Sequence, residues 1–181
     1  MDYYKLYIFL SFAIGVIGLI IGSVNFFLNE EKIEKAEKFC RERNFGVIIF
    51  FGCLSWCVPH TEAIIFNFLV PYLWYIAIIL AILSYFYLDY LMARAFSGSL
   101  IICAYYLVHS CFDFHSVIAP LMSVIAWLIG IFGIVISAKP SYLRDLLRIS
   151  AKNSKIRYTI SAVTVIFSFL IIGNGLLELM K

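Results

Sequence analysis

The sequence predicts an all-α integral membrane protein, folded as a single polytopic bundle of about six transmembrane helices over residues 1–181. Apolar residues make up 64% of the chain and its mean hydropathy is +0.98, whereas a soluble domain is about 50% apolar. Charged residues make up only 14%, against about 25% in a soluble domain. A chain of this length buries about 70% of its unfolded surface, so one water-soluble core cannot hide so much apolar surface.

The spans are apolar runs near the length that a bilayer requires. About 20 residues at a rise of 1.5 Å each cross roughly 30 Å of hydrocarbon. The first run is interpreted as a retained span, because it is too long for a signal peptide and no A-x-A site follows it. Pro71 and Pro120 fall near the starts of their spans, where proline is best tolerated. The predicted spans are residues 6–28, 44–61, 63–90, 98–114, 117–137 and 158–178.

The basic residues predict the orientation. Segments 29–43, 91–97 and 138–157 hold five, one and six of the 14 Lys and Arg residues. The positive-inside rule therefore makes these three loops cytoplasmic and places both termini outside, in a plasma or inner membrane. An alternative with 46–58 as a re-entrant segment leaves five spans. It would export the six basic residues of 138–157, so the sequence favours six spans.

Two of these cytoplasmic segments are expected to be helical. The first begins at Asn29, a candidate cap, and has three i,i+4 ion pairs in the favourable orientation: Glu31/Lys35, Glu34/Lys38 and Glu37/Arg41. It predicts a charged, solvated helix after span 1. The other begins near Lys139-Pro140-Ser141 and places Leu143, Leu146 and Leu147 on one face, with basic residues beside them. It predicts an amphipathic helix before span 6, at the anionic membrane surface.

Small residues recur at helical spacing in spans 1 and 5, at Gly15, Gly18, Gly22, Gly130 and Gly133. Residues 14–21 match residues 129–136 in residue class, which indicates either an internal duplication or chance similarity of apolar sequence. Glycines at this spacing let helices approach closely. Besides the lipid bilayer, the expected partner is another membrane protein or a second copy of the chain, packed through these glycines. Nothing predicts nucleic-acid binding.

Polar groups that are able to carry chemistry collect at the predicted outer side. His109 and Asp113 are i,i+4 neighbours, so an imidazole–carboxylate pair is expected. The candidate metal ligands are His60, His109, Asp113, His115 and Cys57. The alternative is that these histidines are solvated or cap helix ends and that the cysteines are small buried hydrophobes. No cofactor other than such a metal ion is predicted.

Ionisable residues are scarce within the spans, and Glu178 falls at a span end. Asn25, Asn67 and Asn174 are expected to hydrogen-bond between helices. This scarcity favours a non-enzymatic scaffold or accessory subunit of a membrane complex. A small transporter or channel for a neutral or apolar solute is the first alternative. An outer-face metal or thiol redox enzyme is the second.

Overall fold

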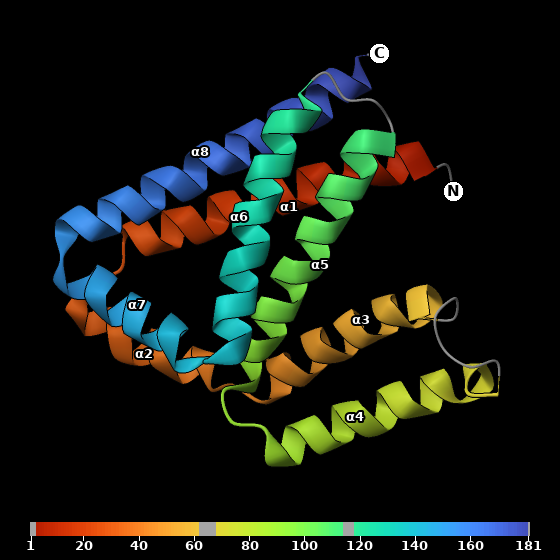
Figure 1. Ribbon diagram of the computed structural model, residues 1–181. Coiled ribbons are helices and arrows are strands. Elements are labelled where there is room, and N and C mark those ends of the chain that lie inside the picture. The colour runs from red at the N-terminus through yellow and green to blue at the C-terminus, as the bar shows by residue number, and fades with distance from the viewer. Residues whose placement is uncertain (1–2, 62–67, 114–117, 181) are drawn as a thin grey trace.

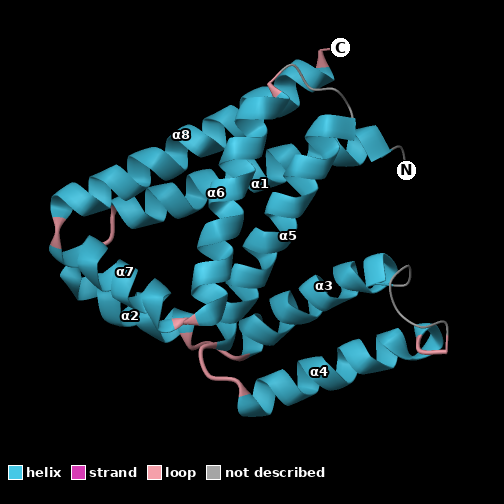
Figure 2. Ribbon diagram, in the orientation of Figure 1, coloured by secondary structure: helices cyan, strands magenta, loops and turns pink. Residues whose placement is uncertain are grey.

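The computed structural model describes residues 3–61, 68–113 and 118–180, and every element in these ranges is a helix (Figure 2). The prediction of an all-α fold is therefore confirmed. In chain order the elements are α1 (Tyr3–Phe26), α2 (Glu30–Cys40), α3 (Asn44–Thr61), the 3₁₀ helix η1 (Val70–Tyr72), α4 (Leu73–Tyr87), α5 (Leu91–Asp113), α6 (Ala119–Ala138), α7 (Ser141–Lys152) and α8 (Ser154–Leu179).

Six helical segments are long and apolar enough to cross a membrane, which confirms the predicted multi-pass architecture. The second of them, Asn44–Thr61, is one continuous helix of 18 residues, which favours a span over the re-entrant alternative. The six segments are Tyr7–Phe26, Asn44–Thr61, Val70–Tyr87, Leu91–Asp113, Ala119–Ala138 and Ser154–Leu179.

Two predicted loop boundaries are corrected. Residues 91–97 form the first two turns of α5 instead of a loop. Arg94 is accommodated there because its guanidinium Nη1 reaches the Ser137 carbonyl, 3.5 Å away at the end of α6. Likewise α8 begins at Ser154 and contains Arg157, which donates to the Leu28 carbonyl at 2.7 Å. In both cases an arginine inside a helix bonds the last carbonyls of a neighbouring helix or its connecting loop.

The long helices associate in pairs (Figure 1). α1 packs along α8, α5 packs along α6, and α3 contacts α5 on one side and α4 on the other. The α1/α8 and α5/α6 pairs meet in a shared core that includes Tyr7, Leu107, Met122 and Ile171. Both ends of the chain lie at the same end of the bundle in Figure 1, which we call the terminal end.

Glycines allow the close approach within the two tightest pairs. A Cβ added at Gly15 or Gly18 would lie closer than 3.0 Å to atoms of α8, and one at Gly22 would lie 2.8 Å from Val165 Cγ2. At Gly130 and Gly133 the added atom would meet α5, 3.2 Å from Ala104 Cβ and 3.0 Å from the Ser97 carbonyl. These glycine faces are thus occupied within the chain. Packing of a partner through them stays a prediction, and it would have to compete with α8 and α5.

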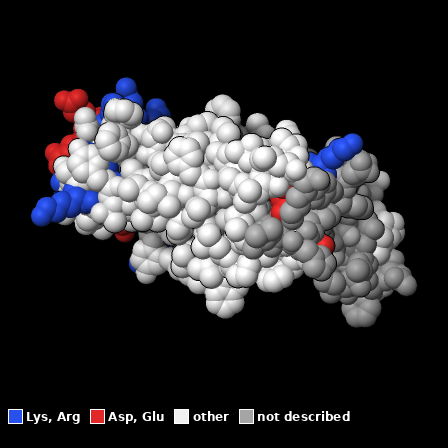
Figure 3. All heavy atoms as spheres, turned by 90° about the horizontal axis from the view of Figure 1, so that it is seen from above, with Lys and Arg blue, Asp and Glu red and all other residues white. Residues whose placement is uncertain are grey.

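The short helices α2 and α7 pack against each other at the opposite end of the bundle from the termini (Figure 1). Charged side chains gather at this end, whereas the broad middle of the molecule is uncharged (Figure 3). We call it the charged end. As predicted, α7 begins at Ser141 after Pro140. The residues that it buries are Ser150 and Ala151, whereas Leu143, Leu146 and Leu147 are half-buried, so the position of the leucine face at the membrane surface stays a prediction.

Candidate functional site

Four of the five predicted metal ligands lie in described segments. Cys57 and His60 are at the end of α3, and His109 and Asp113 are at the end of α5. His109 Nδ1 lies 3.6 Å from Asp113 Oδ2, with side chains 63% and 55% exposed, so the predicted pair forms. Within residues 3–61, 68–113 and 118–180, no three His, Cys, Asp or Glu side chains form a group able to hold a metal ion. His115 lies outside these residues, so the five-residue metal site stays a prediction.

The two described histidines belong to a row of aromatic contacts between α3 and α5. The His60 ring stacks on Trp56 with centroids 6.2 Å apart, and it meets Tyr105 of α5 edge-on, also at 6.2 Å. Tyr105 in turn lies 5.7 Å from the ring of His109. His60 Nδ1 is 3.0 Å from the Trp56 carbonyl. These contacts give both histidines a role in packing the ends of α3 and α5 together.

A buried polar cluster, which no sequence pattern predicts as a group, lies at the terminal end. It consists of Tyr7, Cys111, Asn174 and Glu178, each at most 1% exposed. The Asn174 amide donates to the Tyr7 hydroxyl, which is 3.1 Å from Cys111 Sγ. Glu178 is close enough to Tyr7 and Cys111 to interact electrostatically. The cluster joins α1, α5 and α8, so the prediction that Asn174 hydrogen-bonds between helices is confirmed.

A second polar joint fastens α1 to α7 and α8 near the charged end. Asn25 Nδ2 donates to Ser161 Oγ at 2.9 Å and to the Arg157 carbonyl at 3.4 Å. Asn25 Oδ1 accepts from Ser150 Oγ at 2.9 Å. One asparagine therefore bonds to two other helices, as predicted for Asn25. Asn29 precedes α2 as expected, but its side chain accepts from Arg157 Nη1 at 3.3 Å instead of capping the helix.

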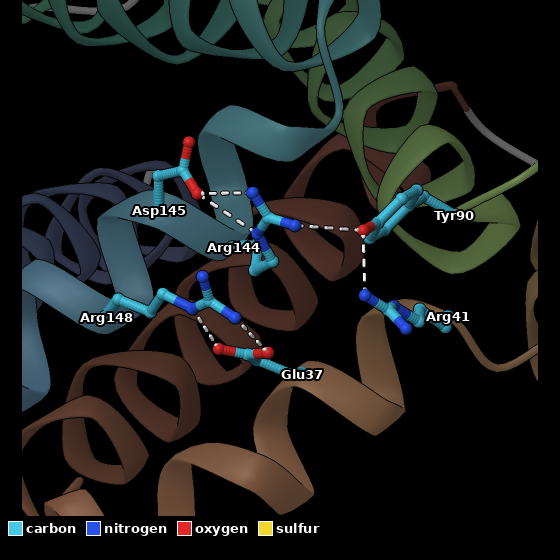
Figure 4. Close-up of polar contacts among 6 residues, drawn as sticks. All are labelled: Glu37, Arg41, Tyr90, Arg144, Asp145 and Arg148. Carbon is cyan, nitrogen blue, oxygen red and sulfur yellow. Dashed lines mark hydrogen bonds and ion pairs between the residues drawn. The ribbon is translucent and has the colours of Figure 1, made fainter.

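The largest group of charges in contact lies where α2, α7 and the start of α5 meet (Figure 4). We call it the arginine–tyrosine cluster, and its members are Glu37, Arg41, Tyr90, Arg144, Asp145 and Arg148. Arg148 donates from Nε and Nη2 to the two carboxylate oxygens of Glu37. Arg144 donates from Nε and Nη2 to Asp145 Oδ1 at 3.0 and 2.8 Å. The Tyr90 hydroxyl accepts from both Arg41 Nη2 at 3.1 Å and Arg144 Nη1 at 3.2 Å.

This cluster corrects the predicted ion pairs of α2. Glu37 bonds Arg148 of α7 through a two-point contact in place of Arg41 on its own helix. Two parallel hydrogen bonds from one guanidinium to one carboxylate are stronger than a single i,i+4 ion pair on a helix surface. The other two predicted pairs, Glu31/Lys35 and Glu34/Lys38, are not within ion-pair distance in the described residues. The alternation of charge along α2 predicted a helix correctly, but not the tertiary partner of Glu37.

The contact between α2 and α7 changes the titration of groups on α2. Hydrogen bonds from Arg148, together with the charges of Arg148, Arg144 and Arg41, hold the pKa of the Glu37 carboxyl below its ordinary value. Cys40, at the end of the same helix, is 4% exposed. Burial, and to a smaller extent the charge of Glu37, raises the pKa of its thiol. Glu37 is therefore an ionised partner of α7, and Cys40 a protonated, covered thiol, at neutral pH.

Tyr90 occupies its place through an uncommon backbone conformation. Its φ is +56°, the one positive φ at a non-glycine residue in the described part of the chain. Gly46 of α3 allows the start of α5 to approach closely, since a Cβ there would lie 2.8 Å from the Met92 nitrogen. The Arg41 guanidinium stacks over the Tyr90 ring at 5.1 Å from its centroid. Surrounding contacts thus hold a strained residue between two arginines.

The fold and these sites define a multi-pass helical membrane protein with polar joints at both ends of its bundle. Comparison of the chain with known protein families, with curated proteins and with solved structures finds no match.

Proposed function

We propose that the protein is a non-enzymatic accessory or scaffold subunit that packs against another membrane protein. The observation that carries this proposal is the one-sided packing of α4. Within the described residues, α4 packs along α3 and makes no extensive contact with another span. Its side toward α3 buries small residues, Ala77, Ala81 and Ser84. Its remaining surface exposes large apolar side chains such as Ile79 and Phe86.

A groove between α3 and α4 gives this surface a shape that suits another helix. Its volume is about 440 Å³ and its walls are almost wholly apolar. Side chains projecting from a neighbouring helix pack into grooves of this kind, and in lipid such packing contributes to helix association. The groove is lined by Val47, Ile48, Phe51, Ile78, Ala81, Ile82, Tyr85 and Phe86. We therefore propose α3 and α4 as the partner surface, in place of the glycine faces of α1 and α6.

We further propose that the charged end faces the cytoplasm, with both termini outside a plasma or inner membrane. In support, 12 of the 14 Lys and Arg residues belong to the connecting segments and helix ends gathered there. Short segments this basic are seldom translocated. The orientation is tested by labelling a cysteine introduced at Lys35, in a variant whose five native cysteines are replaced by alanine, with a membrane-impermeant maleimide. Inverted vesicles should react and sealed cells should not, whereas the reverse pattern would overturn the orientation.

The partner proposal is tested by photo-cross-linking in native membranes. A photoreactive residue at Ile78 or Ile82 should give one discrete adduct of the same mass at both positions, because both line the same groove. The matched control is Val163 of α8, which is exposed but does not line this groove. Native mass spectrometry in mild detergent then distinguishes a second copy from a different protein. Isolated monomers, together with equal lipid-only labelling at all three positions, would refute the proposal.

A small transporter or channel for a neutral or apolar solute is the second candidate, and the buried polar cluster favours it. An ionisable side chain such as Glu178 inside a transmembrane helix often marks a transport pathway. Uptake of small neutral solutes by reconstituted vesicles tests this candidate. Glu178→Gln should lower the uptake if the cluster lines the pathway. Solute entry no faster than into protein-free vesicles would eliminate it.

The outer-face metal or thiol enzyme is the remaining hypothesis, and it depends on His115. Metal analysis of the purified protein tests it directly, with His109→Ala as the comparison. Stoichiometric metal that is lost in His109→Ala would support this hypothesis. Metal content unchanged by the substitution would count against the predicted ligand set.

A further inference from the structure

The Tyr90 hydroxyl is the meeting point of two guanidinium groups from different helices. Arg41 at the end of α2 and Arg144 of α7 each donate one hydrogen bond to this oxygen, at 3.1 and 3.2 Å (Figure 4). Two positive groups are therefore held close together by a neutral acceptor. Like charges at such separation repel each other, and the Glu37 carboxylate, which interacts electrostatically with Arg41, Arg144 and Arg148, offsets only part of this repulsion because it serves three cations.

The acceptors inside the cluster are already in use. Asp145 accepts two of the donors of Arg144, and Glu37 accepts from Arg148. Within the described part of the chain, no carboxylate lies within ion-pair distance of Arg41. Three arginines and two carboxylates leave the cluster with one excess positive charge, and the contacts place that excess at Arg41.

The donors, by contrast, are in surplus. A guanidinium has five N–H donors and no acceptor, and Arg41 uses one of them on Tyr90. The Tyr90 oxygen accepts two hydrogen bonds, and its own O–H proton has no acceptor among the described residues. Donors of Arg41, Tyr90 and Arg144 that have no acceptor among the described residues thus gather at one place. A phosphate group supplies the complementary negative charge and several acceptor oxygens, and arginine forks match its geometry.

The position of the cluster indicates where such a phosphate would come from. Tyr90 directly precedes the transmembrane helix α5, and α2 and α7 lie just beyond the ends of the other spans. Arg41 is exposed and the Arg144 side chain is 24% exposed, so both are accessible. Phospholipid headgroups lie at this depth, and basic residues there attract anionic lipids.

We propose that Arg41, Tyr90 and Arg144 form a binding site for the phosphate of an anionic phospholipid headgroup at the charged end of the bundle. The two guanidinium groups bind the phosphate oxygens from either side, and the Tyr90 hydroxyl donates to it between them. The strained backbone of Tyr90 is what places the phenol between the arginines. This site is independent of the partner surface at α3 and α4.

The test is a titration of the full-length protein, purified in mild detergent, with short-chain phosphatidic acid followed by native mass spectrometry. Arg41→Gln and Arg144→Gln should each weaken binding about five- to tenfold, as expected from loss of one basic group at a membrane surface. Lys35→Gln and Lys152→Gln remove the same charge from exposed positions of the same two helices. These controls should change the affinity less than about twofold, because exposed charges that make no contact with the bound phosphate are screened by solvent and salt. Arg41→Lys should recover only part of the loss, because lysine lacks the planar fork.

Two comparison ligands distinguish the source of the phosphate. Phosphatidylcholine should bind far more weakly than phosphatidic acid, and millimolar inorganic phosphate should not displace the lipid. Displacement by inorganic phosphate would show a site for a soluble phosphate and overturn the lipid assignment. Equal losses in the arginine variants and the lysine controls would show diffuse attraction and overturn the site itself. If Arg144→Gln lowers the melting temperature, Arg41→Gln, at an exposed position, decides the outcome alone.

Discussion

Substituting Gly18 by alanine tests whether close approach holds α1 against α8. The added Cβ would lie closer than 3.0 Å to Ser168 Oγ, a distance that side chains do not tolerate. Ser168 is 3% exposed and its hydroxyl donates to the Thr164 carbonyl at 2.8 Å, so it has little room to move. Overpacking of this kind costs about 1–3 kcal/mol. We expect Gly18→Ala to lower the free energy of unfolding by an amount in that range.

Two further variants distinguish the effect of this contact on stability from the effect of alanine on helix propensity. Gly173 of α8 has nothing within 4 Å of an added Cβ, so Gly173→Ala should be neutral or stabilising by up to about 1 kcal/mol. Ser168→Ala removes the clashing oxygen and leaves Ser168 Cβ at 3.4 Å, an ordinary contact. The double variant Gly18→Ala/Ser168→Ala should therefore recover most of the loss, with a coupling energy of at least about 1 kcal/mol.

Unfolding by SDS in mixed micelles, followed by far-ultraviolet circular dichroism, measures these free energies. Simple addition of the two single losses in the double variant would show that Gly18 and Ser168 do not clash. If Gly173→Ala destabilised the protein as much as Gly18→Ala does, the effect would not come from the contact with Ser168 either.

Four further outcomes follow from the polar joints. Arg148→Gln should release α2 and expose Cys40, so alkylation of a variant with Cys40 as its sole cysteine should accelerate several-fold. The pKa of the Glu37 carboxyl is lowered in the folded protein, so the ion pair of Glu37 with Arg148 stabilises the fold fully above the ordinary carboxyl pKa and is lost as pH falls through the lowered pKa. Hydrogen exchange of the α2 amides, corrected for the intrinsic pH dependence of exchange, should therefore become faster over this pH range. The Glu37→Gln variant should not show this increase. Asn25→Ala should lower the unfolding free energy by about 1–2 kcal/mol, and Tyr7→Phe by about 1–3 kcal/mol, both measured by SDS unfolding.

Much of the fold can be predicted from the sequence, because membrane spans are long runs of apolar residues. Asn44–Thr61 was bounded correctly by the polar residues that flank an apolar run. The start of α5 was misplaced because Arg94 resembles a loop charge in the sequence. Its guanidinium reaches the end of α6 and so remains within a helix. Such a contact depends on which helices are neighbours, and a single sequence does not specify that.

The sites were less predictable for the same reason. From the sequence, Glu178 is expected at the end of a span, but in the structure the start of α1 packs against α8 and Glu178 is buried. Glu37 has a suitable basic neighbour on its own helix but bonds Arg148, which is 111 residues away. The glycines were correctly assigned to close helix packing. Periodicity alone could not identify their partners, because the glycines of α1 pack on α8 at the other end of the chain, whereas those of α6 pack on α5, the helix that directly precedes it.

The three helix pairs differ in the contacts that hold them together. This difference relates the proposed partner surface at α3 and α4 to the proposed phosphate site at the charged end. α1/α8 is joined by glycine contacts and by Asn25, and α5/α6 by glycine contacts. In α3/α4 the Tyr85 hydroxyl donates to Asn44 Oδ1 at 3.3 Å near one end of the pair, and an apolar groove opens between the two helices. The arginine–tyrosine cluster connects α7, which continues into α8, with α2 and with the start of α5. A lipid phosphate bound there would strengthen the link between the two tight pairs, while α3 and α4 are the least buried of the six candidate spans and leave the most surface for a partner.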